Sequence, residues 1–151
     1  MNFTIKAIEP TDLPDLQPMA EKFAAESGCF PGFQMQLFSC FWTMLLESKK
    51  GVIFYLYADE TLAGTLGALA FTEPYTGRET ALEFFVYVAE PFRASGAGKM
   101  LFDTYERWAK EMGCQEIRLG HLENSMPEML KGFYGKMGYT AMETNYRKEI
   151  G

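Results

Sequence analysis

The feature that most constrains the fold is an apolar strand that leads directly into a glycine-containing loop and a long helix. Residues 80–88 are apolar at almost every position, which is typical of a strand buried on both faces of its sheet. A helix is expected after the loop, at residues 96–112. A buried strand needs further strands beside it and helices over it. The sequence therefore predicts an α/β fold with residues 80–88 as a central strand.

Hydrophobic periodicity places the other elements on either side of this unit. Before it, with Thr11 as the cap of the first helix, the pattern predicts a strand, two helices and two strands at residues 3–9, 11–27, 33–48, 52–58 and 62–71. After the helix it predicts a strand, a helix and a final strand at residues 116–121, 127–137 and 139–150. The order βααβββαβαβ predicts a mixed sheet with helices on both faces.

Length and charge limit the range of functions. The chain has 151 residues, of which 48% are apolar, so we expect a single domain over residues 1–151 with a buried core. Its formal net charge of -6 repels nucleic-acid phosphates, so neither DNA nor RNA is an expected partner. A cationic partner fits the acidic balance better.

The cysteines and the single histidine argue against a metal site or a disulfide framework. Cys29, Cys40 and Cys114 are far apart, no C-x-x-C pair occurs, and His121 is the only histidine. We therefore expect no metal, and reduced thiols as in the cytosol. The N-terminal residues contain no long apolar run, and no stretch reaches the ~18 apolar residues of a membrane span. The expected protein is cytoplasmic, with no signal peptide and no membrane partner.

The loop between the central strand and the helix has the properties of a phosphate-binding site. Gly96 and Gly98 allow the backbone to approach a ligand closely, and the following helix directs free N–H groups into the loop. Arg93 and Lys99 add positive charge. The Lys-Ser/Thr of a Walker loop and the third glycine of a dinucleotide fingerprint are missing, which argues against a nucleotide-binding module. An ordinary strand-to-helix turn is the alternative, but this spacing favours binding of a pyrophosphate.

Two patterns in the sequence resemble motifs of a known family. Residues 93–98 read Arg-x-x-Gly-x-Gly after a strand, and residues 133–139 read Phe-Tyr-Gly-Lys-Met-Gly-Tyr. In this order they are similar to the motifs of the GNAT superfamily of N-acyltransferases, and the expected order of elements matches that family over nearly the whole chain. The resemblance, strongest to short bacterial and phage members, implies a GNAT-type, mostly antiparallel sheet and an N-acetyltransferase with acetyl-CoA as its cosubstrate.

The same resemblance implies where acetyl-CoA binds. The loop backbone would hold the pyrophosphate through Arg93, Ala94, Ser95, Gly96, Ala97, Gly98 and Lys99. The strand before the loop would pair with the pantetheine arm through Val86, Tyr87 and Val88, beside a bulge that separates two central strands. Asn124 is a further implied contact, but it lies ten residues before Tyr134, whereas many relatives have seven. Pro91 is also displaced by one place relative to the family pattern.

Acetyl transfer to an amine requires a base for the amine proton and benefits from an acid for the leaving thiolate. The resemblance implies Tyr134 as the acid, and the alternative is that its ring only packs in the core. Glu83 is the only charged residue within the central strand and our first candidate for the base, because burial would raise its pKa. The alternatives are that Glu83 pairs with Arg78 or faces water, that His121 is the base, or that ordered water removes the proton.

The acceptor is expected to be an amine, carried by a small molecule or a protein. Loops at residues 26–33 and 73–77 are expected to bind it, and their Phe30, Phe33 and Tyr75 suit an amine attached to an apolar body. A non-catalytic acyl-CoA-binding sensor or scaffold is the competing hypothesis. Tyr134 and the intact loop favour the enzyme, which is expected to act as a monomer or a homodimer.

Overall fold

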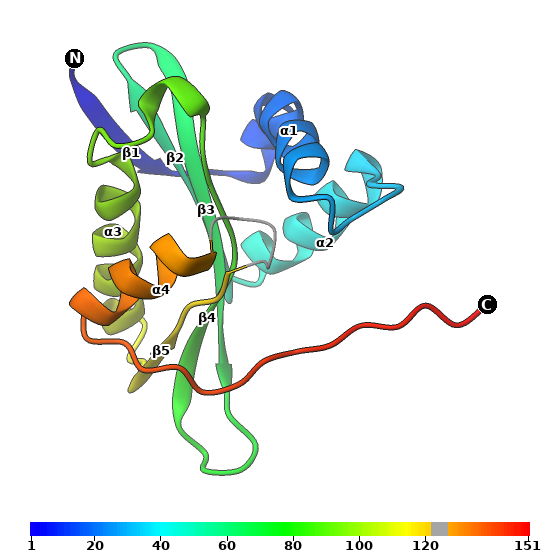
Figure 1. Ribbon diagram of the computed structural model, residues 1–151, viewed down its shortest axis with the longest axis vertical. Helices are drawn as coiled ribbons and strands as arrows, with labels where there is room; N and C mark the ends of the chain where they lie inside the picture. Colours follow the sequence, from blue (N-terminus) through cyan, green and yellow to red (C-terminus); the bar gives the residue numbers. More distant parts are fainter. Residues whose placement is uncertain (122–126) are drawn as a thin grey trace. The chain divides into compact units, whose positions relative to one another are not determined.

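The computed structural model describes residues 1–121 and 127–151 in two compact units, Met1–Gly120 and His121–Gly151, which are treated separately (Figure 1). The second unit contains α4 (Pro127–Lys136). No helix among the described residues has the length and apolar character needed to cross a membrane. The prediction of a single domain over the whole chain stays a prediction.

The first unit contains β1 (Phe3–Ala7), a 3₁₀ helix (Pro10–Leu16), α1 (Gln17–Ser27), α2 (Met35–Glu47), β2 (Gly51–Ala58), β3 (Thr61–Thr72), β4 (Glu79–Val88), a 3₁₀ turn (Glu90–Phe92), α3 (Ala97–Glu111) and β5 (Glu116–Arg118).

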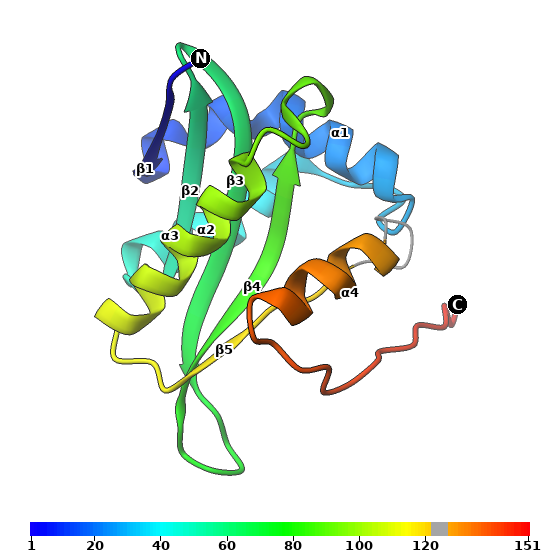
Figure 2. The ribbon, with the colours of Figure 1, turned by 60° about the vertical axis from the view of Figure 1, so that its left-hand side comes forward.

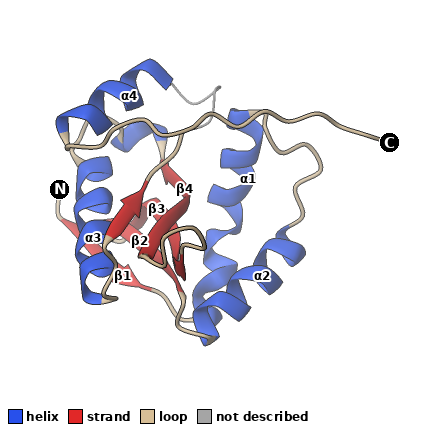
Figure 3. Cartoon of the chain, turned by 90° about the horizontal axis from the view of Figure 1, so that it is seen from below, coloured by secondary structure: helices blue, strands red, loops and turns tan. Residues whose placement is uncertain are grey.

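The strands of the first unit form one sheet in the order β1-β2-β3-β4-β5. Each of β1 to β4 is antiparallel to the next, and β5 runs parallel to β4. Figures 1 and 3 show α1 and α2 on one face of the sheet and α3 on the other. The predicted mixed, mostly antiparallel sheet with helices on both faces is thus confirmed.

One face of α3 is buried through side chains that recur every four residues. Ala97, Leu101, Tyr105 and Ala109 are each at most 1% exposed, so they form one continuous stripe. The Tyr105 hydroxyl also donates a hydrogen bond to the carbonyl of Arg118, at 2.9 Å, which ties the helix to β5. These contacts fix the start of α3, and with it the loop that follows β4.

β4 contains a bulge at Phe84. Gly67 of β3 lies opposite Phe85 and Ala68 lies opposite Glu83, so Phe84 is an extra residue in the register. Phe84 and Phe85 both contact α2, and their ring centroids lie 5.7 and 5.3 Å from that of Trp42. The Phe85 ring lies over Gly67, where a Cβ atom would approach the ring to 2.3 Å. This arrangement therefore requires a glycine at position 67.

β4 and β5 pair over three residues and then separate. The ladder joins Thr80, Ala81 and Leu82 to Glu116, Ile117 and Arg118. β4 continues to Val88, but beyond Leu82 no strand among the described residues pairs with its outer edge. Figure 2 shows the two strands diverging. Among the described strands, this part of β4 therefore pairs with β3 alone, and β5 is shorter than the strand predicted at residues 116–121.

The first predicted helix begins differently from the expectation. Residues 10–16 form a 3₁₀ helix, and α1 starts only at Gln17, because Pro14 lacks the N–H that an α-helix would need there. Glu9, not Thr11, is the N-cap residue. It exchanges hydrogen bonds with Asp12 in a capping box, which stabilises this end of the helix.

The final strand predicted at residues 139–150 is not formed. Residues 139–151 belong to no helix or strand, and every side chain after Tyr139 is exposed. The large apolar side chains of this segment, Met142, Tyr146 and Ile150, recur every four residues, whereas a half-buried strand needs a period of two. The pattern of this segment is therefore only a weak signal for a strand.

We predict that Gly67→Ala lowers the free energy of unfolding by about 1–3 kcal/mol, because the new Cβ must displace the Phe85 ring. Gly135→Ala is the matched control. It lies within α4, where a Cβ would meet no atom within 4 Å, so it should be neutral or stabilise by up to ~1 kcal/mol. Urea unfolding of both variants measures the difference. Equal stability of Gly67→Ala and the wild type would contradict the packing of Phe85 over this glycine.

Candidate active site

The loop between β4 and α3 presents open backbone. Ala94 and Gly96 have φ angles of +65° and +90°, so two residues of this short loop adopt the left-handed conformation. A Cβ atom at Gly96 or Gly98 would meet no atom within 4 Å. The first turn of α3, which begins at Ala97, leaves N–H groups without intrahelical partners. An open backbone at a helix N-terminus fits a bound phosphate anion.

The two cationic side chains of the loop have partners within the chain. Arg93 donates from Nε to the carbonyl of Val88 at 2.7 Å and pairs with Glu26 at 3.1 Å. Lys99 pairs with Asp103 at 2.7 Å, one helical turn further along α3. Both cations lie beside the start of α3, so their charges add to the attraction that its N–H groups and dipole have for an anion.

Tyr87 joins β4 to the end of α1. Its hydroxyl donates a short hydrogen bond to the Glu26 carboxylate, and the Arg93 guanidinium lies 5.3 Å from its ring centroid. Burial, and then the hydrogen bond to Glu26, raise the pKa of Tyr87 to about 12. The same hydrogen bond, with the ion pair to Arg93, lowers the pKa of Glu26. Tyr87 is therefore protonated and Glu26 ionised at neutral pH.

Glu83 lies where β4 and β5 separate. The backbone N–H of Gly120 donates to its carboxyl group at 3.3 Å. Burial raises the pKa of Glu83 to about 7, and the bond from Gly120 opposes part of that shift. Arg78, considered above as a partner for Glu83, instead contacts Glu116 at 3.7 Å and the carbonyl of Gln115. A carboxyl group that titrates near neutrality is suited to act as a base.

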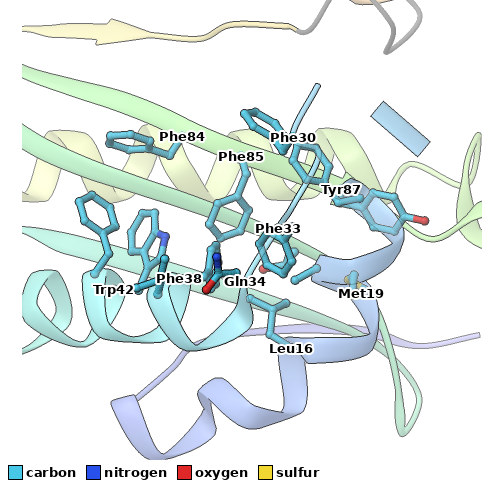
Figure 4. A pocket seen from close by; sticks show the side chains of 15 residues that line it. Leu16, Met19, Phe30, Phe33, Gln34, Phe38, Trp42, Phe84, Phe85 and Tyr87 are labelled. Carbon is cyan, nitrogen blue, oxygen red and sulfur yellow. The ribbon is translucent and has the colours of Figure 1, made fainter. Parts of the chain in front are cut away.

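An apolar pocket lies between α1, α2 and β4 (Figure 4). Its volume is about 420 Å³, within the range of small-molecule sites. Phe30 and Phe33, expected to face the acceptor, are among the lining residues, but no residue of the 73–77 loop is. In that loop the Glu73 carboxylate accepts hydrogen bonds from Tyr75 and Thr76 and closes a turn.

Sequence reasoning missed most of this pocket. α2 and β4 supply most of its other aromatic rings, among them those of Phe38, Phe41, Trp42, Phe84 and Phe85. The signal is present as aromatic residues at three- and four-residue spacing in α2 and as a double phenylalanine in β4. Periodicity indicates only core at these positions, because it cannot locate the bulge that brings the rings together.

The remaining candidate residues belong to the second unit. Tyr134 is the buried residue of α4, and its ring centroid lies 6.2 Å from that of Tyr139. Met129 of the same helix is 62% exposed. His121 is half-buried at the start of the unit, and Asn124 lies outside the described residues. Within residues 1–121 and 127–151, no cluster of His, Cys, Asp or Glu could hold a metal ion.

Comparison with solved structures shows a shared fold. A ribosomal-protein-alanine N-acetyltransferase from Brucella melitensis biovar Abortus 2308 superposes with a TM-score of 0.76 at 19% identity, covering 99% of this chain and 100% of that one. For a predicted acetyltransferase with acetyl-CoA from Clostridium acetobutylicum the TM-score is 0.79 at 16% identity, with 99% and 96% covered. An aminoglycoside acetyltransferase from an uncultured soil metagenomic sample, in complex with sisomicin, gives 0.74 at 18% identity, with 99% and 95% covered.

Sequence comparison identifies the family. No curated protein matches the chain. The sequence profile of the Acetyltransferase (GNAT) family matches residues 18–139, which include the loop after β4, the separated ends of β4 and β5, and α4. The chain therefore belongs to the GNAT family of acetyltransferases.

Proposed function

We propose that the chain transfers an acetyl group from acetyl-CoA to a primary amine by direct attack within a ternary complex. The observation that carries the proposal is the separation of β4 and β5 at Glu83, six residues before the open loop begins at Ala89. A carboxyl group with a raised pKa thus lies on the same strand that leads to the loop proposed to bind the pyrophosphate. Membership of an acetyltransferase family supports the same reaction.

Acetyl-CoA supplies the activated thioester carbonyl. The N–H groups of residues 93–98 and the start of α3 would hold the pyrophosphate, because these groups form an open backbone at a helix N-terminus. The outer edge of β4 at Val86 and Tyr87 would pair with the amides of the pantetheine arm, since no described strand occupies that edge. The carbonyl of Val88 already accepts a hydrogen bond from Nε of Arg93, and this bond ties the loop to the end of β4.

Glu83 would accept the proton that the amine loses. With a pKa of about 7, it is about half ionised at neutral pH, so it can act as a base and still release the proton afterwards. Tyr134 would donate a proton to the leaving thiolate, a role that rests on the family motif. His121 is the second candidate for the base.

The acceptor is proposed to be an amine carried by a small molecule or a protein. Among the structural relatives, one is named for the alanine of a ribosomal protein and another is an aminoglycoside acetyltransferase bound to sisomicin. At under 25% identity these relatives share the fold of this chain, and its own pocket bears on the choice of acceptor.

Gly96→Val is expected to abolish acetyl-CoA binding, because a β-branched side chain at φ +90° distorts the loop and covers its backbone. Gly77→Val is the matched control, since that residue also has a positive φ, +75°, and open space around it but lies outside the loop. Calorimetric titration with acetyl-CoA compares the two folded variants. Retained affinity in Gly96→Val, or an equal loss in both, would contradict the proposed binding loop.

Glu83→Gln should remove a rising limb near pH 7 from the pH profile of kcat/KM. The activity should fall most at neutral pH and recover partly at higher pH, where free amine is abundant. His121→Gln should change the profile little. The reverse pattern would make His121 the base. If the pH profiles of both variants are unchanged, water removes the amine proton.

The stability of Glu83→Gln provides a control that does not depend on catalysis. The pKa of Glu83 is about 7 in the folded chain, against an ordinary value of 4.5, so the folded chain holds a proton that the unfolded chain releases. The free energy of unfolding of the wild type should therefore decrease as pH rises from 4.5 to 7. This decrease should be smaller in Glu83→Gln.

Tyr134→Phe should lower kcat by about 10²–10⁴-fold while acetyl-CoA affinity changes little, because the ring remains and only the proton donor is lost. Steady-state kinetics and calorimetric titration separate the two effects. Tyr134→Leu, which removes the ring as well, should also reduce stability. Near-normal turnover in Tyr134→Phe would assign the tyrosine a packing role.

A further inference from the structure

We propose that the acceptor amine is carried on an apolar, preferably aromatic, body, and that this body occupies the pocket between α1, α2 and β4. The inference rests on the acetyltransferase function proposed above and adds to it the chemical class of the acceptor. Figure 4 shows the rings of Phe38 and Trp42 from α2 and of Phe84, Phe85 and Tyr87 from β4 around this pocket.

No lining side chain carries a formal charge at neutral pH. The polar lining side chains are Gln34, Thr65, Tyr87 and, through its indole N–H, Trp42, and the hydroxyls of Thr65 and Tyr87 are already engaged. The Thr65 hydroxyl donates to the carbonyl of Phe54 at 2.9 Å, and the Tyr87 hydroxyl donates to Glu26. The pocket therefore offers a ligand mainly aromatic and aliphatic surface.

Such a lining selects against hydrophilic and polycationic amines. Each hydroxyl or ammonium group of an amino sugar or a polyamine would lose water on entry, and an unpaired buried polar group costs on the order of 1–3 kcal/mol. An aromatic body loses no hydrogen bonds. It can pack against the pocket rings edge-to-face, the geometry that Trp42 already adopts with Phe84 and Phe85.

The position of the pocket assigns it to the acceptor rather than to the acyl chain. α3, whose N-terminus forms part of the candidate acetyl-CoA loop, covers one face of the sheet, and the pocket lies on the face covered by α1 and α2 (Figure 3). β4 contributes residues to the pocket and leads into the loop before α3. An amine held in the pocket would thus approach β4 from the face opposite to α3.

The first experiment measures kcat/KM at saturating acetyl-CoA for ethylamine, butylamine, 2-phenylethylamine, spermidine and kanamycin. Each methylene that enters the pocket should raise kcat/KM about fourfold. 2-Phenylethylamine should exceed ethylamine by roughly 10–100-fold, the value expected for burial of a phenyl ring. Spermidine and kanamycin should be the poorest substrates. Equal rates for ethylamine and 2-phenylethylamine, or a preference for either polycation, would overturn the proposal.

The second experiment links this preference to the pocket through a matched pair of variants on α2. Leu37 lines the pocket and is 63% exposed, whereas Met44 does not line it and is 70% exposed. Both side chains are exposed enough that replacement by Gln should leave the fold intact. Leu37→Gln should raise KM for 2-phenylethylamine about threefold or more and KM for ethylamine by a smaller factor, and Met44→Gln should change neither.

Two further outcomes are distinguishable. If Leu37→Gln instead changes the preference between acetyl-CoA and octanoyl-CoA and leaves the amine preference unchanged, the pocket holds the acyl chain and the proposal is wrong. If no amine is acetylated, the proposed function fails, and calorimetric titration of 2-phenylethylamine still tests the pocket. Binding that weakens in Leu37→Gln but not in Met44→Gln would support the pocket, and no binding to the wild type would overturn it.

Discussion

The three-residue pairing between β4 and β5 is the constraint on which the candidate site depends. A parallel strand normally shares its whole edge with its neighbour, but here the ladder ends at Leu82 and Arg118. The outer edge of β4 then remains unpaired by any described strand up to Val88. Glu83 stands at the point of separation and accepts a hydrogen bond from the backbone of Gly120. A longer β5 would leave neither the open edge nor a place for this carboxyl group.

The bulge at Phe84 shapes the face of the sheet that α1 and α2 cover. One additional residue in β4 directs two consecutive rings toward α2, and the missing side chain of Gly67 makes room for one of them. Trp42, 2% exposed, contacts both rings and connects them to the core. The shape of the pocket thus depends on a residue of β3 that does not line it.

The sequence predicted those parts of the molecule that depend on local pattern. Arg93, Gly96 and Gly98 after an apolar strand indicated the loop, and together with the motif at residues 133–139 they indicated the family. An isolated charge within that strand was sufficient to single out Glu83. Contacts between distant residues were not predictable. The pair Arg93–Glu26 joins residues 67 positions apart, and the aromatic pocket depends on a register shift that leaves no periodic signal. The roles of Tyr134 and Asn124 rest on the family resemblance and that of His121 on its place after a predicted strand, and these roles, like that of Glu83, stay predictions.

The link from Arg93 through Glu26 to Tyr87 connects the loop after β4 with the apolar pocket. Arg93 belongs to the loop after β4, Tyr87 lines the apolar pocket, and Glu26 holds both. An anion that drew Arg93 away from Glu26 would change the partner of the carboxylate to which Tyr87 donates. Any such effect of one ligand on the affinity of the other is reciprocal. Ligands at the loop and in the pocket would then bind as a coupled pair, each changing the affinity for the other by the same factor through these three side chains.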